Sequence, residues 1–390
     1  MSSTLADVVA ALEQRYPTGT AQAWDAVGLV VGDPAAPVRR VLFAVDPVAA
    51  VADEALAWGA DLLVTHHPLF LRAVHGFAAG TAKGAVAHRL ARAGVALYAA
   101  HTNADAAAGG VADALADAIG LVDVQPLVAA AGEPLDKVVV MVPVEHAERL
   151  VDALAAAGAG ALGEYTRAAF TSTGEGTFVP SPAAHPAIGR AGEVARVVEA
   201  RIEMVAPRRR RAAVVAALRA SHPYEEPAFD ILEPAALPGP TGLGRVGRLP
   251  EPQTLDAFAR RVAGALPATA QGVRYAGEPG LVVRKVAVLG GSGDSELDAV
   301  RAAGADAYVT SDLRHHPASE ARERADFEGR GTPALVDTAH FASEWPWLAR
   351  AADRLAADLA TAGATVETRV SVLVTDPWTG HVDTHRKDSV

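Results

Sequence analysis

Segments from the first part of the chain recur in the last part at one constant spacing, and this repeat limits the possible folds most. Each copy lies 245 residues after its original. The matching pairs are 38–41 (VRRV) with 283–286 (VRKV), 59–61 (GAD) with 304–306, and 64–65 (VT) with 309–310. Because the matches span a full strand–helix–strand unit, we predict two related α/β halves, at about 1–128 and 243–375.

Short apolar runs predict the strands of both halves. The runs are 41–45, 61–65 and 94–100 in the first half, with a helix at 49–58, and 286–289, 308–310 and 334–337 in the second. Strands that are apolar throughout and alternate with helices are typical of a parallel or mixed sheet with both faces covered. The predicted fold class is therefore α/β, with the two pseudo-repeated halves forming one domain.

The residues between the halves follow a different order of elements. We expect strands at 137–142, 168–178, 197–205 and 227–232, and helices at 145–157 and 208–220. The order βαββαβ is that of the ferredoxin-like α+β fold, and a linker rich in Pro and Gly follows at 234–244. The predicted domains are 1–130 and 241–376 as two halves of one domain, 131–240 as an inserted domain, and 377–390 as a polar tail.

The composition limits the chemistry that this fold can carry. The 390 residues include no Cys, which excludes disulfides, thiolate metal ligands and cysteine nucleophiles. The formal net charge of −11 disfavours nucleic acid and anionic membrane as partners. We find no run of about 20 apolar residues and no basic, apolar signal peptide, so we expect a cytoplasmic protein without a membrane span. A metal site in this chain must use His and carboxylate ligands.

Polar clusters follow the predicted strands at three places. They are His66 with His67, His101 with Asp105, and His340 with Glu344. Each has an ordinary structural explanation: a surface pair, a turn built on Asn and Asp, and a helix start with a nearby Glu. Their common position after strands favours a binding site, because ligands of open α/β sheets bind beyond the carboxyl ends of strands.

The combined clusters predict a dinuclear metal centre. Three histidines, one Asp and one Glu suit two divalent ions such as Zn, Fe, Mn or Ni, about 3.5–4 Å apart. The predicted ligands are His66, His67, Asp105, His340 and Glu344. Two divalent ions outweigh two carboxylates and a hydroxide, so we expect a small anionic ligand.

Five motifs resemble those of the Nif-three-like family, whose members are often called GTP cyclohydrolase I type 2 homologues or dinuclear metal centre proteins. The motifs are 24–29 (WDAVGL), 64–69 (VTHHPL), 101–105 (HTNAD), 290–293 (GGSG) and 340–344 (HFASE). The inserted segment resembles the family's longer form at 174–178 (GEGTF) and 221–230 (SHPYEEPAFD). The resemblance extends from about residue 5 to 375. Ala26 departs from it, because many members carry Asn at that position.

The resemblance implies more than the residue pattern alone. It implies that His66, His340 and Glu344 hold one metal and that His67, Asp105 and Glu344 hold the other, with Glu344 as the bridge. It also implies a toroidal homohexamer with the sites facing an inner cavity. The inserted domain would be similar to PII and CutA proteins.

Further residues near the predicted centre are candidates for catalysis or binding. His101 is either a general acid or base or a partner of a metal ligand. Asp312, His315 and His316 follow the strand at 308–310 and either contact the substrate or form an exposed turn; we take His101 and His316 as the candidate catalytic residues. The glycines at 290–293 either bind a phosphate or make a tight turn. The arginines at 208–211 either form a solvated helix face or bind an anion or acidic partner.

These observations favour a metal-dependent hydrolase that acts on a small anionic molecule, with nucleotides among the candidates. The family name suggests opening of the GTP ring, in which water attacks C8 of guanine and formate is lost. A phosphoester or another cyclic amide remains an open alternative. The competing hypothesis is a metal-binding regulatory or scaffold protein, whose PII-like domain senses a small molecule or partner without turnover.

Overall fold

The computed structural model describes residues 3–382, which form two compact units with a mixed α/β architecture. The larger unit contains the residues up to Ala130 and those from Pro240 onward, and the smaller unit is Ala131–Gly239. No helix within residues 3–382 combines the length and the apolar character that crossing a membrane requires. The division into halves and a tail stays a prediction, and residues 383–390 of the predicted tail lie outside the described part.

The first sheet of the larger unit has five strands in the order β17-β4-β5-β6-β2. Its strands are β2 (Gly28–Val31), β4 (Arg40–Ala44), β5 (Leu62–Thr65), β6 (Ala96–Ala99) and β17 (Glu367–Val370). The first four strands in this order are parallel, and β2 runs antiparallel to β6. A separate short pair joins β1 (Ser3–Thr4) to β3 (Pro37–Val38).

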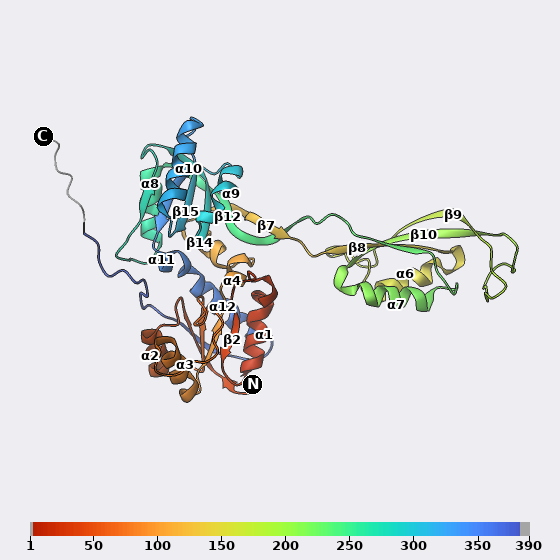
Figure 1. Ribbon diagram of the computed structural model, residues 1–390, viewed down its shortest axis with the longest axis horizontal. Helices are drawn as coiled ribbons and strands as arrows, with labels where there is room; N and C mark the ends of the chain where they lie inside the picture. Colours follow the sequence, from red (N-terminus) through yellow and green to blue (C-terminus); the bar gives the residue numbers. More distant parts are fainter. Residues whose placement is uncertain (1–2, 383–390) are drawn as a thin grey trace. The chain divides into compact units, whose positions relative to one another are not determined.

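Helices cover both faces of this sheet (Figure 1). One face packs against α1 (Leu5–Arg15) and α12 (Pro346–Thr361), and the other against α2 (Ala49–Trp58) and α3 (Ala82–Ala93). Successive strand residues point to opposite faces, so Phe43 enters the first core and its neighbour Leu42 the second. Burial on both faces explains why these strands are apolar throughout.

The second sheet has six strands in the order β13-β16-β15-β14-β12-β7. Its strands are β7 (Val122–Ala131), β12 (Pro238–Thr254), β13 (Arg274–Ala276), β14 (Val282–Ser292), β15 (Ala307–Ser311) and β16 (Ala334–Thr338). The central strands β14, β15 and β16 are parallel. One face packs against α5 (Val111–Ala118) and α8 (Leu255–Ala265), and the other against α9 (Leu297–Ala302) and α10 (His315–Phe327).

The smaller unit is one antiparallel sheet with two helices, in the order β11-β8-β10-β9. Its elements are β8 (Leu135–Pro143), α6 (Ala147–Ala156), β9 (Phe170–Phe178), β10 (Ala195–Pro207), α7 (Arg211–Ser221) and β11 (Phe229–Leu232). They confirm the strands and helices predicted for this segment. Both helices pack on the sheet through one core (Figure 1).

The arginines at the start of α7 form ion pairs within the smaller unit. Arg208 and Arg211 form ion pairs with the buried Asp136 and with Glu233. Arg209 pairs with Glu133. These intramolecular pairs favour the interpretation of a solvated helix face over that of a site for an acidic partner.

Candidate metal centre

The carboxyl ends of parallel strands from both sheets of the larger unit meet at one cavity of about 800 Å³. The short helices α4 (Thr102–Ala106), after β6, and α11 (His340–Glu344), after β16, begin at this edge. The strand-end residues that line the cavity are Asp46 after β4, His67 after β5, His101 after β6, Asp312 after β15 and His340 after β16. The cavity therefore lies where the polar clusters were expected.

The structure brings all five predicted ligands together around Glu344, which is 2% exposed. Its Oε1 lies 2.9 Å from His340 Nε2 and 3.3 Å from His66 Nε2, and its Oε2 lies 3.2 Å from His67 Nε2. Asp105 Oδ1 is 3.7 Å from His66 Nε2. Side chains from both sheets thus converge on a single buried carboxylate.

The division of these residues between two ions stays a prediction, and the distances show which ligand atoms lie closest. His67 Nε2 lies 3.2 Å from His340 Nε2, and both lie beside Glu344. His66 Nε2 lies 3.3 Å from Glu344 Oε1 and 3.7 Å from Asp105 Oδ1. Ligand atoms of His67, His340 and Glu344 all lie within 4.8 Å of one another, so these three side chains can hold one ion.

Each histidine of the cluster is held through its Nδ1 atom. The acceptors are Asp46 for His67 (2.7 Å), Asp312 for His340 (2.7 Å), Asp25 for His101 (2.8 Å) and the carbonyl oxygen of Ala100 for His66 (2.9 Å). A carboxylate or carbonyl that accepts from one ring nitrogen leaves the other free to bind a metal. Sequence reasoning did not identify Asp25 and Asp46 in this role, although Asp46 follows a predicted strand.

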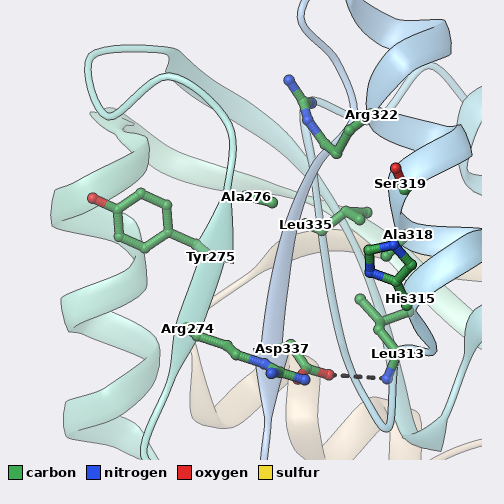
Figure 2. Close-up of a pocket in the computed structure, with 10 residues that line it drawn as sticks. All are labelled: Arg274, Tyr275, Ala276, Leu313, His315, Ala318, Ser319, Arg322, Leu335 and Asp337. Atoms are coloured by element: carbon green, nitrogen blue, oxygen red, sulfur yellow. Dashed lines mark hydrogen bonds and ion pairs between the residues drawn. The ribbon is translucent and has the colours of Figure 1, made fainter. Parts of the chain in front are cut away.

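The two candidate catalytic histidines have different positions. Ligand atoms of His101, His66 and His67 lie within 4.8 Å of one another, so His101 is part of the cluster and a further possible ligand. His316 is exposed in the first turn of α10 and is not among the residues that line the cavity, and its catalytic role stays a prediction. Its neighbour His315 lines a separate cleft of about 360 Å³ with Arg274 and Asp337 (Figure 2). Both histidines lie in the first turn of α10, outside the set of residues that line the cavity, whereas Asp312 precedes this helix and lines the cavity.

The buried carboxylate controls the electrostatics of the cluster. Burial alone would raise the pKa of Glu344, but the surrounding histidines hold it well below its usual range. Glu344 in turn raises the pKa of His340 to about 11, and against the effect of burial it helps raise that of His67 to about 10. Burial raises the pKa of Asp105 to about 6 and lowers that of His101 to about 4.

The donor set fits divalent metal ions. His66 Nε2 and Glu344 Oε2 are buried, and neither has a hydrogen-bond partner among residues 3–382. Buried polar atoms are normally paired, and imidazole nitrogens with carboxylate oxygens are ligands for Zn, Fe, Mn and Ni. The clustered His and Glu side chains can therefore hold a metal ion.

Gly291 and the buried hydroxyl group of Ser343 lie next to Glu344 and His340. A Cβ atom on Gly291 would lie 2.6 Å from Glu344 Oε1 and 3.2 Å from His340 Nε2. The Gly291 N–H donates to Ser343 Oγ at 2.9 Å, and Ser343 Oγ donates to the His340 carbonyl oxygen at 2.8 Å. The Gly291 N–H is therefore not free to bind a phosphate, and residues 290–292 are the end of β14, with the chain leaving the strand at Gly293.

Comparisons with known proteins agree over nearly the full length of the chain. Residues 3–377 match the model of the family described as Duf34/NIF3 (NGG1p interacting factor 3). The GTP cyclohydrolase 1 type 2 homolog of Mycobacterium tuberculosis is 51% identical over 381 residues, covering 97% of each chain. The protein of that name from Mycobacterium leprae is 49% identical, covering 97% of this chain and 96% of the relative.

Solved structures are similar over the same length. A Bacillus cereus protein related to NIF3 superposes with a TM-score of 0.76 at 36% identity, covering 97% of this chain and 99% of that chain. A Staphylococcus aureus protein superposes with a TM-score of 0.82 at 27% identity and the same coverage. The mixed α/β fold with several sheets is therefore shared with these proteins.

Proposed function

The chain belongs to the Duf34/NIF3 (NGG1p interacting factor 3) family, and on this premise we propose that it is a dinuclear metal-dependent hydrolase. One observation carries the proposal: five candidate ligand side chains from two sheets converge, and two of their buried ligand atoms have no hydrogen-bond partner among residues 3–382. The proposed ligands are His67 and His340 for one ion and His66 and Asp105 for the other. Glu344 would bridge the two ions.

The residues around the centre have distinct roles in this proposal. When bound, two divalent ions supply Lewis-acid polarisation of the substrate and acidify water. Asp46 and Asp312 hold His67 and His340 in orientation through Nδ1. His101, with Nδ1 engaged by Asp25, has Nε2 left to bind an ion or to move a proton at the reacting group.

The proposed substrate is a small anionic molecule that fits the cavity. A volume of about 800 Å³ is in the range that holds a nucleotide-sized ligand. The relatives' name, GTP cyclohydrolase 1 type 2 homolog, supports testing hydrolytic opening of the GTP ring. Phosphoesters and other cyclic amides belong in the same test.

The proposal extends to the architecture that the sequence suggested. The strand order β11-β8-β10-β9 with helices α6 and α7 supports a ferredoxin-like, PII- and CutA-like domain inserted between two halves. The parallel sets β4-β5-β6 and β14-β15-β16 support a structural repeat in those halves. A cytoplasmic homohexamer, as the sequence led us to expect, completes the proposal.

Metal analysis combined with a substrate panel tests the proposed function. The purified protein should contain up to two divalent ions per chain and hydrolyse at least one member of a panel of GTP, other nucleotides and phosphoesters. Glu344→Gln should lower both metal content and turnover, because it removes the bridging charge. Glu323→Gln on the exposed surface of α10 serves as the control. A metal-loaded protein that is inert across the panel would favour the regulatory or scaffold alternative.

A further inference from the structure

Two tryptophans from opposite ends of the chain line the cavity of the metal centre. Trp24 lies before β2 and is 60% exposed, and Trp378 lies after β17 and is 67% exposed. Tryptophan is highly buried on average in folded proteins. Exposed indole rings in a concave site are a common surface for a planar ligand ring, because ring faces stack.

The segment that carries Trp378 is attached to the sheet and brings a carboxylate with it. The Ser371 N–H donates to the Phe43 carbonyl oxygen at 2.8 Å, and the Thr375 hydroxyl donates to Asp46. Asp376 follows directly and lines the cavity. Its Oδ2 atom is buried and has no hydrogen-bond partner within residues 3–382.

An unpaired buried carboxylate oxygen needs a donor. Leaving such an acceptor unsatisfied is unfavourable, and a charged donor would form the stronger kind of hydrogen bond with it. Other carboxylates at the cavity, Asp46 and Asp312, are already engaged by His67 and His340. Asp376 therefore offers a ligand a carboxylate oxygen that has no hydrogen-bond partner within residues 3–382. The ring faces of Trp24 and Trp378 also attract cations.

We propose that Trp24, Trp378 and Asp376 form an outer subsite that binds a planar ring carrying N–H donors or a positive charge. This proposal rests on the proposed function in one respect, because it places the reacting group of the same molecule at the metal centre. The substrate then has two unlike ends. Its donor-bearing ring contacts Trp24, Trp378 and Asp376, and its electrophilic, anionic end faces the histidines, an arrangement that fits a phosphoester substrate better than attack on C8 of guanine.

Three probes of nearly equal size test the subsite directly: benzamidine, benzamide and benzoate, which are cationic, neutral and anionic. Binding to the full-length protein is followed by tryptophan fluorescence and calorimetry, first after metal removal by chelation and then with metal restored. In the metal-free protein we expect benzamidine to bind more tightly than benzamide, and benzamide more tightly than benzoate. Benzamidine should still bind more tightly than benzamide after metal is restored.

Variants separate the carboxylate from the rings. Asp376→Asn is isosteric and should reduce the preference for benzamidine over benzamide by about tenfold, because it removes the charge-assisted hydrogen bond. Trp24→Ala and Trp378→Ala should weaken both probes, and benzamidine at least as much as benzamide, because the ring faces both stack and attract cations. Trp58→Phe is the control, since Trp58 contacts Arg40 and Arg369 and does not line the cavity.

Two results would overturn the proposal: equal binding of benzamidine and benzoate by the metal-free protein, or an unchanged preference in Asp376→Asn. Unfolding curves of each variant show that the protein is folded. The test is independent of turnover. A protein that is inert on the substrate panel but keeps the probe preference contradicts the proposed function and supports the subsite.

Discussion

Replacing Gly291 by alanine tests whether the glycine-rich end of β14 positions the buried carboxylate of the candidate centre. The added Cβ would lie 2.6 Å from Glu344 Oε1 and 3.2 Å from His340 Nε2. The first distance is shorter than a van der Waals contact, so the Glu344 carboxylate or the backbone at Gly291 must move by roughly 0.5–1 Å. Ser343 limits movement of this backbone, because its Oγ accepts from the Gly291 N–H.

The substitution has two separate costs. Gly291 has φ +71°, a left-handed conformation in which alanine loses about 1–2 kcal/mol of stability relative to glycine. The displaced carboxylate should lower metal affinity by about 10- to 100-fold, the range found when groups that orient metal ligands are disturbed. The first cost appears in the free energy of unfolding, and the second in metal binding.

Gly94→Ala is the matched control. Gly94 ends α3 with φ +70°, and a Cβ atom added there would have nothing within 4 Å. In urea unfolding, Gly94→Ala should lose only the cost of the left-handed backbone, and Gly291→Ala at least as much, because its Cβ also meets Glu344. Competition for Zn²⁺ with a chelator should show weaker binding only for Gly291→Ala. The reasoning is refuted if Gly291→Ala binds metal like the wild type, or if Gly94→Ala weakens binding equally.

Three further predictions address the support of the centre and the stability of the two units. Asp46→Ala removes the acceptor of His67 Nδ1 and should lower Zn²⁺ affinity about tenfold; unchanged chelator competition would contradict this. Arg245 is 2% exposed and donates to both oxygens of Asp113, at 2.8 and 2.9 Å. Arg245→Met should therefore cost about 3–5 kcal/mol in urea unfolding, and a change below about 1 kcal/mol would disprove the buried pair's role. Arg211 and Arg208 lower the pKa of Asp136 from 3.8, so its stabilising effect is complete above pH 3.8 and is lost as pH falls through the lower folded value. Asp136→Asn should therefore reduce the dependence of the smaller unit's thermal unfolding on pH in the acid range. An unaltered pH profile would contradict a stabilising role for the Asp136 carboxylate.

The sequence by itself determined the elements and the place of the centre. Apolar runs mark strands buried on both faces, and their ends mark the edge where ligands bind, so β4, β5, β15 and β16 were located closely. His66, His67, Asp105, His340 and Glu344 were identified because each follows such a strand. The sequence pattern shows only where each residue lies along the chain. The family resemblance added the expectation that these five residues lie together in the folded protein.

Only the tertiary structure decided which side chains face one another. The grouping of His67 with His340, the anchoring role of Asp46 and the exposed position of His316 all depend on how two sheets present their edges. Trp378 reaches the cavity because the chain after β17 is bound to the strand ends, although its polar surroundings in sequence suggested a loose tail. Periodicity fixes which residues are buried, but the direction of a side chain at a strand end is set by packing between segments distant in sequence.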